Sequence, residues 1–378
     1  MPYEILNRTL PGLSDALKQQ TKLDVWAMLK RLLEANAPSG GANLLGGIGD
    51  DIAVLADGLG LREHVISQLG STGNTAIWLG ADKAAADVIV VAHMDRPSFR
   101  FKSIEDGSLF PICAIRFPTD DYRVTAKALR FEKGRLVVGA QGVIAYHKGN
   151  NTLRFEAAKG QLAWQDTVVM DVTPVCDGDV VIGTGLDNSL GTLMALLAAA
   201  ALCQVEAVLK DRRCLFVFTD QEEGPPEAFF GHGAARLMHA VPPPTYGCVV
   251  VDAQTAGPGL VPQMGAGVSY SAASGWGRGA IVPPNYHTLA IDLADGLNRA
   301  RPGTVQINTG HLSRSDDMIL GQWTRILALS GPPMTDPHTG QETAHLSDIQ
   351  SGAWWLAYLT AACLNVAPDL TPRYALGR

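Results

Sequence analysis

Four unbroken apolar runs along the chain each lead into residues that can bind a metal ion. The runs with their polar ends are residues 88–95, 214–223, 248–252 and 326–338. Runs of four or five apolar residues are typical of strands buried on both faces of a parallel sheet. Open parallel sheets hold their ligands at the carboxyl ends of the strands. We therefore expect the polar ends to meet in one cleft, and the chain to be a metal-dependent hydrolase.

Helical periodicity alternates with these runs. Apolar residues at helical spacing predict a helix within residues 12–36, and a longer apolar stretch predicts a helix at about 190–209. Further helices are expected at about 288–301 and 347–364. The expected fold class is therefore α/β, with a mixed, largely parallel sheet flanked by helices.

The pattern changes between about residue 99 and residue 180. Short alternating runs, such as 124–131 and 135–146, are separated by Gly, Asn and Asp, which is typical of a small β-rich unit. A chain of 378 residues is long enough for two domains. We expect a catalytic α/β domain formed by residues 1–98 and 181–378, interrupted by an inserted β-rich domain at 99–180.

The composition is that of an ordinary globular protein, with 47% hydrophobic and 18% charged residues. The formal charge of -7 disfavours general binding to nucleic acid. The start of the chain lacks a secretory signal pattern, and the most apolar stretch, 193–203, is about half the ~20 residues that a membrane span needs. Six scattered cysteines without a Cys-x-x-Cys pair indicate reduced core residues. We expect a cytoplasmic protein that binds neither nucleic acid nor membrane.

Two of the candidate metal ligands also have a plain structural explanation. His93 can bind a metal through one ring nitrogen while Asp95 accepts the other ring N–H and fixes the tautomer. The alternative for His93 is a hydrogen-bonded histidine at a strand end. Asp187 lies in a glycine-rich turn before a helix, where an aspartate is commonly an N-terminal cap. In the company of the other candidates, its two oxygens could instead bridge two metals.

The adjacent pair Glu222 and Glu223 is the most informative feature. Neighbouring carboxylates project differently, so one can bind a metal while the other takes a proton from an activated water. Asp252 directly follows an apolar strand and would be costly to bury without a cation. With His338 as a further candidate, the donor set suits two zinc ions, with cobalt or manganese as alternatives. Calcium and magnesium sites would not need the histidines.

Nine short motifs occur in order along nearly the whole chain. They are Pro38-Ser39-Gly40, Gly73-Asn74, Ala92-His93-Met94-Asp95, Leu186-Asp187-Asn188, Gln221-Glu222-Glu223, Val251-Asp252, Ser315-Asp316, His338-Thr339-Gly340-Gln341-Glu342 and Leu346-Ser347-Asp348-Ile349. In this order and spacing they resemble the M42 aminopeptidases, within the di-metal exopeptidases that also include the M18, M20 and M28 peptidases. Single motifs are weak signals, but the ordered series is specific.

The resemblance implies a role for each matching residue. The implied ligands are His93 and Asp252 for one metal, Glu223 and His338 for the other, and Asp187 as the bridge between them. Glu222 would be the general base, with Asp95 as the second catalytic residue. The inserted β-rich unit matches the family's inserted β domain, which covers the cleft and often mediates assembly. The resemblance therefore also implies a homo-oligomer.

Three departures from the family pattern bear on substrate specificity. Arg96-Pro97 replaces the usual Glu-Ile, Asn188 stands where a second acidic residue is usual, and segment 224–234 is longer than the family link. A guanidinium keeps its charge at working pH, so an Arg96 that points into the cleft would favour a substrate with a carboxylate. An Arg96 that pairs with a nearby carboxylate would give no preference. The candidate substrate-binding residues are Arg96, His232, His311 and Asp316.

Three functions remain open from the sequence. The first is an aminopeptidase that releases N-terminal residues from peptides through a metal-activated water. The second is an amidase or deacylase that uses the same two metals on a small N-acyl compound. The third, a non-catalytic binding protein on a peptidase fold, is disfavoured because candidates for five ligands and a base are all present. Loops form the substrate pocket, so the sequence separates the first two functions poorly.

Overall fold

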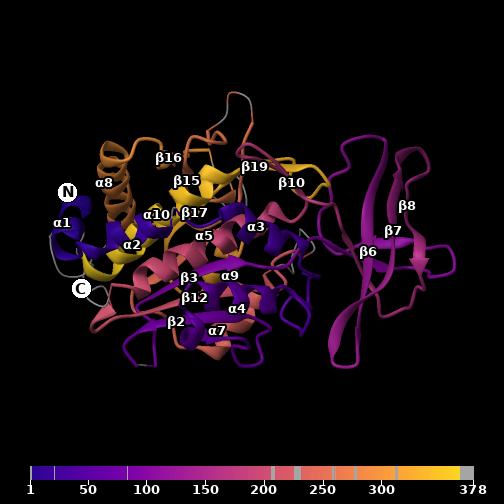
Figure 1. Ribbon diagram of the computed structural model, residues 1–378, viewed down its shortest axis with the longest axis horizontal. Helices are drawn as coiled ribbons and strands as arrows, with labels where there is room; N and C mark the ends of the chain where they lie inside the picture. Colours follow the sequence, from indigo (N-terminus) through magenta and orange to yellow (C-terminus); the bar gives the residue numbers. More distant parts are fainter. Residues whose placement is uncertain are drawn as a thin grey trace.

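The computed structural model shows a larger α/β body and a smaller β-rich body beside it (Figure 1). It describes residues 2–20, 22–82, 84–205, 209–224, 231–257, 259, 261–275, 279–310 and 314–366. Two features named above fall outside these ranges. They are His311 and the middle of the 224–234 segment.

An eight-stranded sheet forms the centre of the larger body. Its strands, in spatial order, are β1 (Val65–Ile66), β2 (Thr75–Gly80), β12 (Arg213–Thr219), β3 (Val88–His93), β13 (Gly247–Val251), β17 (Ile326–Gly331), β15 (Val268–Ser271) and β16 (Val305–Ile307). The four strands β12, β3, β13 and β17 run parallel to their neighbours in this set. Strand β2 runs antiparallel to β12, and β15 runs antiparallel to β17 but parallel to β16. The expected mixed, largely parallel sheet is confirmed.

The central strands are buried on both faces. Every residue of β3, β13 and β17 is buried, which explains the unbroken apolar runs in the sequence. Successive side chains of a strand point to opposite faces, so Val88 and Val90 belong to one hydrophobic core and Ile89 and Val91 to another. Because the four central strands are parallel, the polar residues that follow them arrive at the same edge of the sheet.

Helices cover both faces of this sheet (Figure 1). They are α1 (Pro2–Thr9), α2 (Gly12–Gln20), α3 (Val25–Glu34), α4 (Ile48–Gly58), α5 (Leu186–Cys203), α7 (His232–Ala240), α8 (Pro284–Ala300), α9 (Asp317–Leu320) and α10 (Leu346–Asn365). Helices α7 and α9 pack on one face, and the other helices join the core on the opposite face. Helix α5 is long and apolar enough to cross a membrane, but 89% of it is buried inside the molecule, as in the core helix of a globular protein.

One helix prediction needs correction. Residues 12–36 form two helices, α2 and α3, instead of one. Helix α3 begins after Asp24, whose carboxylate accepts a hydrogen bond from the backbone N–H of Ala27 at 2.9 Å. Such a cap satisfies a backbone donor that has no partner within the helix. The periodicity runs across the break because both helices bury their apolar faces in the same core.

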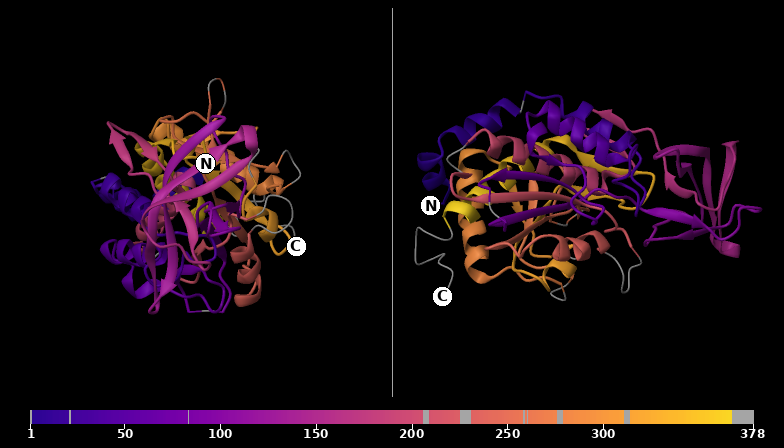
Figure 2. Two further views of the ribbon diagram at one scale, coloured as in Figure 1. Left: turned by 90° about the vertical axis from the view of Figure 1, so that its right-hand side faces the viewer. Right: turned by 90° about the horizontal axis from the view of Figure 1, so that it is seen from below.

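The β-rich body has its own sheet and its own hydrophobic core. Its strands, in spatial order, are β5 (Leu109–Pro111), β4 (Ser98–Phe101), β9 (Thr167–Met170), β6 (Asp121–Glu132), β7 (Arg135–His147) and β8 (Thr152–Gly160). Side chains from these strands, including Phe99, Ile144 and Val168, form a separate buried cluster. Figure 2 shows that this sheet projects beyond the end of the larger body.

A third sheet lies where the chain returns from the β-rich body. Its strands, in spatial order, are β10 (Val175–Asp177), β11 (Val180–Gly183), β19 (Glu342–His345), β18 (Pro333–Thr335) and β14 (Gln254–Thr255). Strand β11 pairs with β19. Asp187 follows β11 at the start of α5, and His338 lies in the loop between β18 and β19. The pairing therefore brings these two residues, 151 positions apart in the sequence, to the same place.

Candidate active site

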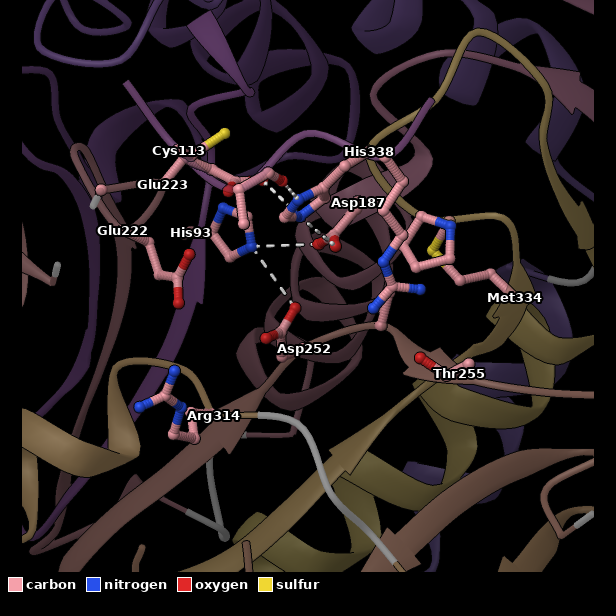
Figure 3. A pocket seen from close by; sticks show the side chains of 15 residues that line it. His93, Cys113, Asp187, Glu222, Glu223, Asp252, Thr255, Arg314, Met334 and His338 are labelled. Atoms are coloured by element: carbon pink, nitrogen blue, oxygen red, sulfur yellow. Dashed lines mark hydrogen bonds and ion pairs between the residues drawn. The ribbon is translucent and has the colours of Figure 1, made fainter. Parts of the chain in front are cut away.

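The expected metal ligands meet at the carboxyl edge of the central sheet. His93 ends β3, Asp252 follows β13, and Glu223 lies in the segment after β12. Asp187 lies at the start of α5, where its backbone departs from helical geometry, and His338 lies in the β18–β19 loop. Figure 3 shows these side chains gathered around one another. All five line a cavity of about 270 Å³.

His93 stands between two carboxylates. Its Nε2 lies 3.1 Å from Oδ1 of Asp187 and 3.3 Å from Oδ1 of Asp252. Its Nδ1 lies 3.3 Å from the backbone carbonyl oxygen of Asp95. Burial disfavours a charged ring, but the surrounding carboxylates, with Glu222 first among them, raise the pKa of His93 well above its usual value.

His338 repeats this arrangement on the other side of Asp187. Its Nε2 lies 3.1 Å from Oε1 of Glu223 and 3.4 Å from Oδ2 of Asp187. Its Nδ1 donates a hydrogen bond to the carbonyl oxygen of Ala114 at 2.6 Å. Here too burial opposes the charged ring, and Glu223 with Asp187 raises the pKa of His338 well above its usual value. The two oxygens of Asp187 thus face two different histidines.

This donor set fits divalent cations. A carbonyl oxygen only accepts hydrogen bonds, so each ring carries a hydrogen on Nδ1, and the neutral ring presents a lone pair at Nε2. The lone pair then faces carboxylate oxygens, which is unfavourable unless a proton or a metal ion lies between them. Among the residues that the structure describes, Oε1 of Glu223 and Oδ1 of Asp252 are buried and have no hydrogen-bond partner. Buried carboxylate oxygens are normally paired or bound to metals.

Asp95 holds the backbone of the two adjacent glutamates. Its Oδ1 accepts the N–H of Glu222 at 3.0 Å, and its Oδ2 accepts the N–H of Glu223 at 3.2 Å. The carboxylate lies 3.7 Å from Nδ1 of His93, which is too long for a hydrogen bond. The expectation that this carboxylate orients the histidine therefore needs correction. The backbone carbonyl of Asp95 contacts the ring, and the carboxylate orients the loop after β12.

Glu222 lines the cavity beside the ligand groups. Figure 3 shows it next to His93 and on the side away from His338. Burial raises the pKa of Glu222 well above its usual value, and the neighbouring carboxylates of Glu223 and Asp252 add to this rise. A carboxyl group with a raised pKa at the wall of the cavity has the position and the chemistry of a proton acceptor.

Glu342 is a further residue of the site, and the sequence analysis assigned it no role of its own. It is fully buried, and its Oε1 accepts the N–H of His338 at 2.9 Å. Its Oε2 accepts the N–H of Leu186 at 2.7 Å, directly before Asp187. Burial raises the pKa of Glu342 to about 8. This carboxyl group joins the loop of one ligand to the loop of another, and its place in the closing motif was the available signal.

Arg96 does not reach the cavity, and its assignment to substrate binding is wrong. Its buried guanidinium donates to the carbonyl oxygens of Leu32 at 2.5 Å, Leu33 at 2.9 Å and Ala35 at 3.3 Å. These carbonyls lie at the C-terminal end of α3, where most carbonyls lack an intrahelical donor, although that of Leu32 also accepts the N–H of Ala35 at 3.2 Å. Burial lowers the pKa of Arg96 to about 10. Arg96 therefore closes the end of a helix and does not select a substrate.

Two other substrate-binding candidates lie away from the cavity wall. Asp316 is fully buried, its Oδ2 accepts a hydrogen bond from Oγ1 of Thr219 at 2.5 Å, and it is not among the residues that line the cavity. Burial raises the pKa of Asp316 to about 6. His232 begins α7, and its backbone N–H donates to the carbonyl oxygen of Gln221 at 3.0 Å. His311 lies outside the described residues.

The asparagine at position 188 has a structural explanation. Its Nδ2 donates to the carbonyl oxygen of Val251 at 2.8 Å, and its Oδ1 accepts the N–H of Gly191 at 3.1 Å. The side-chain amide has both N–H donors and a carbonyl acceptor, whereas a carboxylate could only accept. Asn188 therefore links the start of α5 to the end of β13, between two metal-ligand candidates.

The chain just after β5 also contributes to the cavity. Cys113, Ala114 and Arg116 line the cavity, as does Arg314 from the larger body. Single residues after a short edge strand form no motif, so no pattern in the sequence selects them. The cavity therefore has walls from both bodies of the molecule.

Comparison with known proteins extends this description. No family model matches the chain, and no curated protein matches its sequence. Solved structures match its fold over most of its length. A TET aminopeptidase from Thaumarchaeota archaeon SCGC AB-539-E09 has a TM-score of 0.71 at 15% identity, over 90% of this chain and 96% of that chain. The fold is that of the TET aminopeptidases.

Two further structures support this assignment of the fold. An aminopeptidase from the archaeon Desulfurococcus kamchatkensis has a TM-score of 0.69 at 18% identity, over 90% of this chain and 94% of that chain. The TET1 peptidase of Pyrococcus horikoshii, which can assemble into a tetrahedron or a large octahedral shell, has a TM-score of 0.69 at 17% identity. That match covers 89% of this chain and 99% of the other. The TET fold confirms the architecture that the M42 resemblance implied.

Proposed function

We propose that the protein is a metal-dependent aminopeptidase that removes N-terminal residues from peptides. The placement of Asp187 is the observation that carries this proposal. One of its oxygens lies 3.1 Å from His93 and the other 3.4 Å from His338. A single carboxylate that faces two histidines is the arrangement needed to join two metal positions.

Each of the two positions has its own set of donors. His93, Asp252 and one oxygen of Asp187 form the first position. Glu223, His338 and the other oxygen of Asp187 form the second position. Mixed nitrogen and oxygen donors favour zinc, with cobalt and manganese as alternatives. When bound, such ions acidify water and polarise a peptide carbonyl.

The chain's own residues supply the proton transfer. Glu222 lies beside the first position, where it can accept a proton from the attacking water and then deliver it to the leaving amine. The carboxylate of Asp95 fixes the backbone of Glu222 and Glu223 through two hydrogen bonds. This arrangement keeps the proton acceptor and a metal ligand at a constant separation.

The cavity indicates the size and charge of the substrate. Its volume of about 270 Å³ is just below the ~300–1,000 Å³ typical of small-ligand sites, which suits the end of a peptide. Arg116 and Arg314 line the cavity, so two arginines supply the positive charge that the sequence had assigned to Arg96. We propose that they favour a carboxylate, as in an acidic side chain or the free C-terminus of a short peptide.

The β-rich body is proposed to control access and to mediate assembly. Residues directly after β5 form part of the cavity wall, so the position of this body determines the width of the entrance. Its sheet projects from the larger body, where another subunit can reach it (Figure 2). The neighbour from Pyrococcus horikoshii forms a tetrahedron or an octahedral shell, and we propose a homo-oligomer for this protein too.

A substrate panel tests the activity. Metal-loaded protein is offered acidic, basic and neutral aminoacyl chromogenic amides, and in parallel N-acylated amino acids, with zinc, cobalt or manganese. We expect hydrolysis of the free-amine substrates, and a loss of about 10²- to 10⁴-fold in kcat for Glu222→Gln with both metals retained. Hydrolysis of the N-acyl compounds alone would instead identify an amidase or deacylase. Near-normal turnover by metal-replete Glu222→Gln would exclude the assigned role of Glu222.

A further inference from the structure

A buried thiol lies beside the second metal position. Cys113 is 5% exposed and lines the cavity. Its sulfur, a carboxylate oxygen of Glu223 and a ring nitrogen of His338 all lie within 4.8 Å of one another. Figure 3 shows Cys113 next to Glu223, on the opposite side of the site from Asp252. The sulfur is therefore placed near the second position and away from the first.

The contact between Glu223 and His338 fits a cation beside this sulfur. The Oε1 atom of Glu223 is buried and has no hydrogen-bond partner among the described residues. Nε2 of His338 faces the same oxygen at 3.1 Å, while Nδ1 of that ring donates to Ala114. The lone pair on Nε2 of His338 and the carboxylate oxygen of Glu223 repel each other at this distance. A metal ion bound to both atoms would remove that repulsion.

The backbone around Cys113 also contributes to the site. Ala114, the next residue, accepts the Nδ1–H of His338 at 2.6 Å and so fixes the orientation and tautomer of the ring. The same short segment therefore orients one metal ligand and carries a sulfur within 4.8 Å of a ring nitrogen of that ligand. A substitution that moved the segment would disturb both groups together.

Given the two metal positions of the proposed function, on which this inference rests, we propose that Cys113 is a ligand of the second position. That position would then have Cys, His, Glu and Asp donors, and four protein donors is the number that closed zinc sites have. Binding forms a sulfur–metal bond and releases the thiol proton to solvent. Thiolate ligands select soft cations, so the second position favours zinc over manganese or magnesium.

A division of roles between the positions follows. The first position has three protein donors, from His93, Asp187 and Asp252, and a three-donor site keeps a coordination position open. Glu222 lies on this side, beside His93 (Figure 3). The closed second position then holds the bridge Asp187 in place, and the open first position faces the substrate.

Cobalt(II) is the probe that tests this proposal without any measurement of activity. The full-length protein is stripped of metal and titrated with cobalt, and its near-ultraviolet absorption is recorded. We expect a thiolate-to-cobalt charge-transfer band in the wild type and its loss in Cys113→Ser, while the visible cobalt bands persist. Cys176→Ser is the matched control and keeps the band, because that sulfur lies in β10 and contacts the carbonyl of Gly178.

Zinc titration supplies the second readout. In Cys113→Ser we expect one zinc position to weaken by about 100-fold or more, since even residues that only orient metal ligands contribute 10- to 100-fold. The other position and the affinity for manganese change far less. Two bound cobalt ions without a thiolate band in the wild type would overturn the assignment of Cys113 and leave the aminopeptidase proposal intact. Failure to bind any divalent metal would overturn both, and the wild-type spectrum decides this even if a variant misfolds.

Discussion

Replacement of Asp95 by asparagine separates two possible roles of this side chain. In the structure, the buried carboxylate accepts the backbone N–H groups of Glu222 and Glu223 at 3.0 and 3.2 Å. Asparagine has one side-chain oxygen, so one N–H loses its acceptor and faces an NH₂ group instead. His93 keeps its contact, because that contact is made by the backbone carbonyl of residue 95.

The loss of stability in Asp95→Asn follows from the one hydrogen bond that the variant loses. A hydrogen bond to a charged acceptor contributes about 1.5 to 3 kcal/mol, and each 1.4 kcal/mol is a tenfold change in an equilibrium constant. We therefore expect Asp95→Asn to lower the free energy of unfolding by about 2 kcal/mol. The loop that carries Glu222 and Glu223 shifts, so kcat falls and the second metal position weakens by about 10- to 100-fold.

Stepwise zinc titration, denaturant unfolding and steady-state kinetics measure these effects in parallel. The control is Asp57→Asn, which changes an exposed aspartate of α4 and should alter none of the three. The first metal position, which includes His93, should change little in Asp95→Asn. If it weakens as much as the second position, the carboxylate of Asp95 acts on His93 and its assignment to the loop after β12 is incorrect.

Three further predictions concern other parts of the molecule. Arg96→Ala should lower the free energy of unfolding by about 3 kcal/mol, since it removes the side-chain donor to the carbonyls of Leu33 and Ala35. It should leave the acidic-to-neutral ratio of kcat/KM unchanged, whereas Arg116→Ala should lower that ratio. Burial raises the pKa of Asp348 to about 6, so the folded state binds this proton more tightly and stability falls as pH rises from about 4 to 6. Relative to Asp348→Asn, the wild type should lose about 3 kcal/mol over this range in denaturant titrations, and parallel curves would contradict this. Sedimentation at micromolar concentration should show a homo-oligomer, and a strict monomer would exclude the assembly role.

The central sheet could be predicted because its strands are buried on both faces. Such strands appear as unbroken apolar runs, and parallel neighbours bring the residues after each run to one edge. His93, Glu223 and Asp252 were predictable on this basis. Asp187 reaches the site from the start of a helix, and His338 from a loop several residues beyond its apolar run, so their assignment as ligands depended on the family resemblance.

The role of Arg96 could not be deduced from its place in the sequence. A charged residue one position after Asp95 is expected near the site, but its long side chain can turn away from the cavity. Here it reaches the end of α3, more than 60 positions earlier in the chain. Only the folded structure shows that three carbonyls at the end of α3 lie within hydrogen-bond distance of the Arg96 guanidinium. Sequence spacing carries no information about such a contact.

Cys113 illustrates a second limit of sequence reasoning. A single cysteine after a short apolar run has the pattern of a core residue, and Cys214 and Cys248 are indeed buried in strands of the central sheet. What distinguishes Cys113 is its distance from Glu223 and His338, which are 110 and 225 positions away. This distance depends on how the β-rich body joins the larger one. No local pattern encodes that junction.

The measurement that tests the central claim most directly is the metal content of the wild type and of Asp187→Ala. Elemental analysis of metal-saturated wild-type protein should approach two divalent ions per chain, and anomalous diffraction should place them roughly 3.5 Å apart. Asp187→Ala should lose occupancy at both positions, because one oxygen of this carboxylate faces His93 and the other faces His338. Two fully occupied metal positions in that variant would contradict the bridging role and the two-metal site built on it.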